Sequence, residues 1–165
     1  TEGNNLSEEN LLKYASKKGI NKDRFIFIKK LGSLSEHLNR LKIVDLFIDT
    51  FPYGSHTTAF DILIAGKPLV ALKGNSFASR ISSSLLKSVN LDSLISVSFE
   101  DYENKINNLI NNKSKLEELN QIIIENKNKT PLFDTKKFTK NLEIAYLKVY
   151  ENFINKKNID NVYIN

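Results

Sequence analysis

The 165-residue chain carries 24 Lys and Arg against 19 Asp and Glu, for a formal net charge of +5, and 41% of its residues are hydrophobic. This length and apolar content suffice for one compact domain with a core. The absence of Cys excludes disulfides and thiolate metal sites, and it permits a reducing compartment.

The basic residues alternate with Asn, Glu and Asp along helical stretches, which favours a solvated surface over a nucleic-acid patch. No stretch approaches the roughly 20 apolar residues that a bilayer span needs. The start, TEGNNLSEEN, lacks the basic and apolar regions of a signal peptide. We therefore expect a cytoplasmic protein with no membrane or nucleic-acid partner. Because position 1 is Thr, we also expect further chain upstream.

The first elements alternate helix and strand. Ser7 is predicted to cap a helix that ends at Gly19, the C′ residue. The β-branched and aromatic run from Arg24 to Ile28 predicts a buried strand. Ser33 and Glu36 have capping-box spacing, which predicts the start of a second helix.

The alternation continues for three more strands. Asp45 to Asp49 is predicted as a strand, and a helix from His56 to Ala65 ends at Gly66. A strand at 67–72, a helix at 78–89 and a short strand at 94–97 follow. Strands and helices at this spacing indicate βαβ units, so we predict a doubly wound, mostly parallel α/β sheet.

From Ser98 onward the apolar residues recur at helical spacing, with Asn and Lys on the other face. Helices are predicted over 98–112, 114–128 and 133–157. We predict a Rossmann-like domain at 1–97, truncated on its N-terminal side, helices packed on it at 98–155, and a flexible tail at 156–165.

The segment FPYGSHTTAFD, residues 51–61, leads from a predicted strand into a predicted helix. Ligands of open α/β sheets bind beyond the carboxyl ends of strands, where such helices begin. A turn that Gly and Ser permit, followed by free helix N–H groups, an imidazole and two hydroxyls, suits a diphosphate. The candidate phosphate-binding residues are Gly54, Ser55, His56, Thr57 and Thr58.

Asp61 lies one helical turn after Thr57, and its carboxylate suits the paired hydroxyls of a ribose. A second interpretation stays open. Ser55 or Thr57 could be a plain N-cap, Asp61 a first-turn acid that suits the helix dipole, and His56 a surface histidine.

Two further loops belong to the same predicted sheet edge. His37 lies in the first turn of the preceding helix, so both histidines could face one crevice at this edge, or His37 could be a partly exposed helix residue. Arg40 shares the face of His37 and could hydrogen-bond a base edge or pair with a nearby acid. Gly32 and Arg80 are further candidates on these loops. A Ser79, His56 and Asp61 triad is disfavoured, because no Gly-x-Ser-x-Gly sequence is present.

DLFIDTFPYGSHTTAFDILIAGKPLVAL, ASRISSSLL and PLFDTKKFTKNLEIAYLKVYENF closely resemble the O-linked N-acetylglucosamine transferase and SPINDLY family, especially its bacterial members. The resemblance covers about Asn5 to Phe153. It implies the second, donor-binding domain of a GT-B glycosyltransferase, with tetratricopeptide repeats elsewhere in the full-length protein. It also implies transfer of a sugar from a nucleotide donor, UDP-GlcNAc, to Ser or Thr of proteins.

The resemblance assigns roles to six of the candidates. His56, Thr57 and Thr58 match the residues that hold the diphosphate and stabilise its departure, and Asp61 matches the ribose ligand. His37 matches the residue packed on the uracil, and Arg40 matches one beside that base. No cofactor or metal is expected besides the donor.

The chain departs from the family pattern in two ways. Leu34 stands where the family usually has a lysine, and the loop before it is one residue longer. The phosphate-binding lysine, the acceptor-side domain and the catalytic base are expected upstream of Thr1, so the chain alone is expected to be inactive. Other sugars, a GDP donor, or a non-catalytic interaction module of the same fold are the alternatives.

Overall fold

A computed structural model describes residues 5–29, 31–158 and 160–164. The chain divides into two compact units, residues 1–39 and residues 40–165. Within the described ranges, no helix has both the length and the apolar character needed to cross a membrane.

The first unit opens with helix α1, Asn5–Lys17. The predicted cap at Ser7 is wrong, because the helix already includes Asn5 and Leu6 and leaves Ser7 inside it. The predicted end is confirmed: Gly19 has φ of +73° and the Ile20 N–H donates to the Ala15 carbonyl at 3.0 Å. This is the Schellman arrangement, in which glycine accepts the left-handed conformation without strain.

The strand predicted at Arg24 to Ile28 is wrong. The 3-10 helix η1, Lys22–Arg24, is followed by residues 25–29 without regular structure, and no described strand pairs with them. Ile26 is 83% exposed, and the Phe25 and Phe27 rings stack with centroids 6.3 Å apart. The run has the composition of a strand, but a strand also needs a partner for its backbone hydrogen bonds.

The capping box of helix α2, Leu34–Leu41, is confirmed. The Glu36 N–H donates to Ser33 Oγ at 3.2 Å, and the Ser33 N–H donates to Glu36 Oε2 at 3.2 Å. Each side chain satisfies a backbone donor of the other residue at the helix start. The local sequence therefore fixes where α2 begins.

The second unit contains a parallel sheet in the order β1-β2-β3. The strands are β1 at Phe47–Ile48, β2 at Leu69–Leu72 and β3 at Ile95–Ser96. Phe47 pairs with Leu69, and Ala71 pairs with Ile95. All four residues of β2 are buried, as expected for a central strand with both faces covered.

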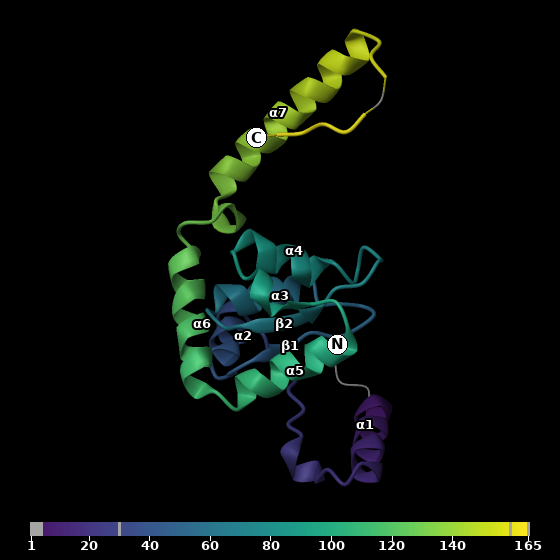
Figure 1. The fold of residues 1–165 in the computed structure, drawn as a ribbon, viewed down its shortest axis with the longest axis vertical. Helices are drawn as coiled ribbons and strands as arrows, with labels where there is room; N and C mark the ends of the chain where they lie inside the picture. Colours follow the sequence, from purple (N-terminus) through teal and green to yellow (C-terminus); the bar gives the residue numbers. More distant parts are fainter. Residues whose placement is uncertain (1–4, 30, 159, 165) are drawn as a thin grey trace. The chain divides into compact units, whose positions relative to one another are not determined.

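Helices cover both faces of this sheet. Helix α3, Thr57–Ile64, joins β1 to β2, and helix α4, Ile81–Ser88, leads through η2, Asp92–Leu94, to β3. Figure 1 shows α3 and α4 on one side of the strands and α5, Phe99–Ile110, on the other. The predicted doubly wound parallel α/β class is confirmed, with strands shorter than predicted.

The three predicted C-terminal helices are also confirmed. After α5 come α6 at Lys113–Asn126, the short 3-10 helix η3 at Pro131–Phe133, and α7 at Thr135–Ile154. Asp134 caps α7 by accepting from the Lys137 N–H at 2.9 Å. No residue of α7, all of which the structure describes, is buried.

The core of the second unit lies between α3, β2, α4 and α6. Its fully buried side chains include Ile62, Leu63, Leu69, Val70, Leu86, Val89 and Ile123. Removing apolar volume from such a site costs the lost transfer energy and leaves a cavity.

We therefore expect Ile62→Ala, in α3, to lower the free energy of unfolding by about 2–4 kcal/mol in urea denaturation. Ile43→Ala is the matched control, because Ile43 is 81% exposed, and it should change stability by no more than about 0.5 kcal/mol. Equal effects of the two substitutions would contradict the described core.

Candidate functional site

The segment between β1 and α3 is a tight turn built around Asp49, which is only 6% exposed. Asp49 Oδ1 accepts the Ser55 N–H at 2.7 Å and the Thr50 N–H at 3.0 Å. Thr50 Oγ1 donates to the Tyr53 carbonyl at 2.6 Å. These bonds fold the chain back so that its next residues enter α3.

The neighbouring strand-to-helix loop holds the same turn from the other side. Ser82 Oγ, on α4, donates to the Ser55 carbonyl at 2.9 Å, and the Gly54 N–H donates to the Ala78 carbonyl at 3.2 Å. A Cβ on Gly54 would lie 3.0 Å from both Ala78 O and Asp49 Oδ2. Glycine is needed at this position because the turn packs closely against the Ala78 carbonyl and the Asp49 carboxylate.

His56 is the N-cap of α3, and among the described residues its side chain makes no capping hydrogen bond. The N–H groups of the first helical residues, Thr57 and Thr58, have no intrahelical partner by position and carry the positive end of the helix dipole. Both threonines are exposed. The start of α3 therefore presents backbone donors and hydroxyls to solvent.

The His56 ring lies between two aromatic side chains. It stacks on Tyr53 with centroids 5.2 Å apart and an interplanar angle of 18°, and it meets Phe77 edge-on at 6.1 Å. Its Nε2 atom is buried and has no hydrogen-bond partner in the described part of the chain. The sequence analysis did not identify Tyr53 and Phe77, which are 67% and 71% exposed, as neighbours of His56.

The structure brings together only part of the predicted set. Gly54, Ser55, His56, Thr57 and Thr58 form one continuous turn and helix start, with Asp61 one turn further along α3. Asp61 is the fifth residue of the helix, so its interpretation as a first-turn acid is wrong. The plain N-cap predicted at Ser55 or Thr57 is wrong as well, since His56 occupies that position.

His37 and Arg40 lie three positions apart in α2, as the shared-face prediction requires. Gly32 precedes the capping box, and a Cβ there would lie 4.0 Å from Glu36 Oε2. His37 and Gly32 belong to the first compact unit and His56 to the second. That both histidines face one crevice therefore stays a prediction.

The loop before α4 is occupied by its own hydrogen bonds. Ser79, which is buried, donates from Oγ to the Ser76 carbonyl at 3.0 Å, and its N–H donates to Ser76 Oγ at 3.2 Å. A Cβ on Gly74 would lie 2.5 Å from Ser79 Oγ. This arrangement explains Ser79 as a loop residue rather than a nucleophile, while Arg80 is the exposed N-cap of α4.

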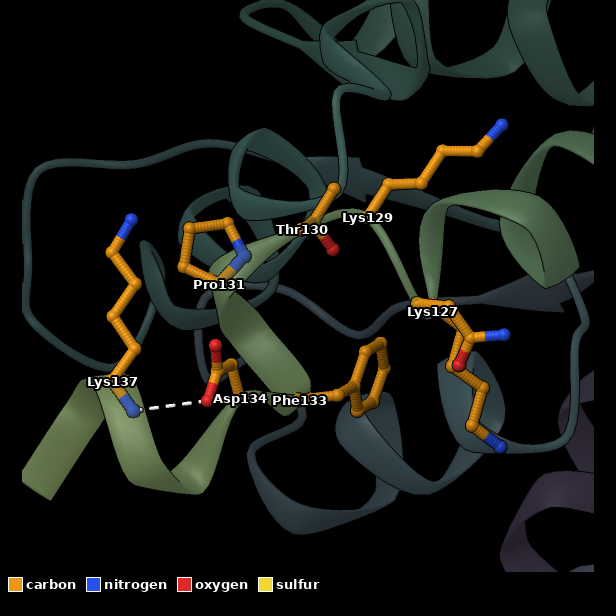
Figure 2. Close-up of a pocket in the computed structure, with 8 residues that line it drawn as sticks. Lys127, Lys129, Thr130, Pro131, Phe133, Asp134 and Lys137 are labelled. Carbon is orange, nitrogen blue, oxygen red and sulfur yellow. Dashed lines mark hydrogen bonds between the residues drawn. The ribbon is translucent and has the colours of Figure 1, made fainter.

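A cavity of about 510 Å³ lies between α6 and α7, lined by residues of the 127–137 segment (Figure 2). Lys127 Nζ donates to the carbonyl of Ile64, the last residue of α3, at 3.2 Å, and Phe133 packs on Phe60 of α3 with centroids 5.5 Å apart. The labelled lysine amines in Figure 2 point in different directions. The contacts of Lys127 and Phe133 support the end of α3 opposite to His56. The cavity beside them is not the candidate site.

No three His, Asp or Glu side chains gather to hold a metal ion in residues 5–29, 31–158 and 160–164. The chemistry of the turn is that of an anion site, since it offers N–H and O–H donors and a helix dipole.

An open parallel sheet with an exposed helix start beyond its first strand defines a Rossmann-like α/β domain. The chain belongs to glycosyl transferase family 41, whose sequence profile matches residues 4–142. This family membership confirms the resemblance on which the site roles were assigned.

Three relatives illustrate the family. The chain is 36% identical over 83% of its length to the probable UDP-N-acetylglucosamine–peptide N-acetylglucosaminyltransferase SEC of Arabidopsis thaliana. It is 31% identical over 72% of its length to the probable transferase SPINDLY of Solanum lycopersicum. It is 25% identical over 94% to the Caenorhabditis elegans enzyme. The chain spans only 14%, 13% and 13% of these relatives.

A solved structure has the same fold. An O-GlcNAc transferase variant from Thermobaculum terrenum superposes with a TM-score of 0.83 at 26% identity, covering 89% of this chain and 28% of that one. The predicted Rossmann-like domain of GT-B type is thereby confirmed.

Gly54→Ala is expected to lower the free energy of unfolding by about 1–3 kcal/mol, because its Cβ would press on the Ala78 carbonyl, which is backbone and cannot rotate away. Gly32→Ala, in open surroundings, is the matched control and should be near neutral. Chemical denaturation compares the two. A neutral Gly54→Ala would contradict the close approach of the two loops.

Tyr102, on α5, provides a pH-dependent test of the turn. Its hydroxyl donates to the Asp49 carbonyl, and burial, together with the nearby Asp49 charge, raises the Tyr102 pKa from 10.0 to about 12. A raised folded pKa means that the stabilisation is complete below the unfolded pKa, near 10, and is lost as pH rises towards 12. The stability advantage of the wild type over Tyr102→Phe should therefore shrink between pH 10 and 12 in denaturation curves. Tyr146→Phe, at an exposed position, is the control and should change stability by no more than about 0.5 kcal/mol.

Proposed function

We propose that this chain is the donor-binding domain of a protein O-glycosyltransferase, and that its donor is UDP-GlcNAc. The observation that carries the proposal is the exposed start of α3, where His56, Thr57 and Thr58 follow a rigid turn. Family membership and the names of the relatives support the sugar and the reaction type. The proposal includes Ser and Thr of cytoplasmic proteins as acceptors.

In this proposal the helix start holds the donor diphosphate. The N–H groups and hydroxyls of Thr57 and Thr58 donate to phosphate oxygens, and the partnerless Nε2 of His56 gains a partner there. As the bond from the sugar to the diphosphate breaks, negative charge grows on the leaving group. Donors already fixed in position stabilise that charge without reorganising.

The nucleoside is assigned to the remaining residues. Asp61 shares a helical face with Thr57 and accepts hydrogen bonds from the ribose hydroxyls. His37 packs on the uracil, with Arg40 beside the base. The proposal gives the stabilising work to these groups and to the α3 dipole, without a metal, and leaves the catalytic base to chain outside these residues.

Isothermal titration calorimetry with UDP tests the proposal. Wild-type chain should bind UDP, and Asp61→Ala or His56→Ala should each weaken binding at least tenfold, or about 1.4 kcal/mol. Asp92→Ala is the matched control, because Asp92 is exposed and precedes β3 at the opposite edge of the sheet.

Full retention of UDP binding in both site variants would remove the assignment of these residues. A chain that ignored UDP and bound oligonucleotides with steep salt dependence would favour a nucleic-acid binder instead. GDP and UDP-sugars in the same experiment separate the alternative donors.

A further inference from the structure

The backbone of Ser55 is held by buried side chains at both of its peptide groups, the one shared with Gly54 and the one shared with His56. Asp49 Oδ1 accepts its N–H at 2.7 Å, and Ser82 Oγ donates to its carbonyl at 2.9 Å. Asp49 is 6% exposed and Ser82 is 2% exposed. The two groups come from different elements, the end of β1 and helix α4, so they tie the residue before His56 to the body of the sheet.

The position of the Ser55 backbone sets the direction in which the chain enters α3. Ser55 directly precedes His56, whose unusual backbone angles, φ −110° and ψ −91°, turn the chain into the helix. A rotation of the peptide group between Ser55 and His56 would move the imidazole and reorient the first N–H groups of the helix. Side chains that over-determine such a turn keep it in one conformation.

Burying the carboxylate of Asp49 costs more desolvation free energy than burying a neutral side chain in the same structural role. A buried carboxylate near an anion site lowers the local potential, and a neutral acceptor could hold two N–H groups at less desolvation cost. What the charge adds is bond strength, because a charge-assisted hydrogen bond is shorter and roughly twice as strong as a neutral one. The bonds to Asp49 therefore hold the turn more firmly than bonds to a neutral acceptor would.

Building on the proposed function, we propose that Asp49 and Ser82 act as a clamp on the Ser55 backbone and are positioning residues for diphosphate binding. They act through the backbone of Ser55 and His56. Their role is to keep the donors at the start of α3 fixed before the ligand arrives, so that no ordering cost falls on binding.

Two readouts test the clamp. UDP affinity is measured by calorimetry, and the exchange rate of the Ser55 amide is measured by NMR. Asp49→Ala and Ser82→Ala should each weaken UDP binding several-fold or more, and Asp49→Ala should also speed Ser55 exchange by at least tenfold. Asp49→Asn, which keeps an acceptor oxygen but loses the charge, should recover only part of both losses.

Matched controls are available on the same elements. Asp45→Ala changes an exposed carboxylate just before β1, and Ser84→Ala removes an exposed hydroxyl two residues from Ser82 on α4. Both should leave UDP affinity and Ser55 exchange unchanged. Melting temperatures of all variants show that the fold persists, and Ser82→Ala serves if Asp49→Ala unfolds.

The outcomes separate the two proposals. Wild-type UDP binding that persists unchanged in Asp49→Ala and Ser82→Ala, while Ser55 exchange accelerates, would overturn the clamp and leave the donor-binding function standing. A wild-type chain that binds no UDP would overturn the proposed function and, with it, the positioning role.

Discussion

The hydrogen bond from the Ser55 N–H to the buried carboxylate of Asp49 is the constraint on which the site depends. It closes the turn that carries the chain from the end of β1 into α3. Thr50 and Ser82 add hydrogen bonds to the Tyr53 and Ser55 carbonyls, and the missing Cβ of Gly54 lets the turn lie against the Ala78 carbonyl. The end of the strand, the turn and the start of the helix are thus one unit, held by Asp49 together with Thr50 and Ser82.

Helix α3 is also fixed at its other end. Lys127 Nζ donates to the Ile64 carbonyl, which places a cation at the negative end of the helix dipole. Phe133 packs on Phe60, while Ile62 and Leu63 are fully buried. A helix held at both ends and along one face cannot tilt, so the donors at its exposed start are held in place. The η3 segment, Pro131–Phe133, therefore supports the far end of α3 and contributes no residue to the candidate site.

The sequence predicted those features whose causes are local. The capping box of Ser33 and Glu36, the helix end at Gly66 and the positions of three strands all follow from patterns within a few residues. The strand predicted at residues 24–28 failed because composition cannot show whether a partner strand lies alongside. The start of α3 was found because glycine, hydroxyls and a histidine gather in one short stretch.

The sequence analysis missed two residues that hold the turn, because they act through contacts outside their own elements. Asp49 was assigned only as the end of a strand, although an acid at a strand end, a few residues before a Gly-Ser turn, is the signal that could have singled it out. Ser82 lies 27 residues from Ser55, and no local pattern relates them. Such contacts become visible only once the strand order places the β1–α3 turn beside the loop that leads into α4.

The donors of this turn divide into two sets with different tasks. The N–H groups of Thr50 and Ser55 point at Asp49 and are consumed inside the protein. Those of Thr57 and Thr58 lie at the free end of the helix and are left for solvent or ligand. The internal acid therefore takes its own donors and does not compete with an anion for the helix start. A buried negative charge can therefore lie close to an anion site, because the N–H dipoles that stabilise Asp49 are not the ones at the start of the helix.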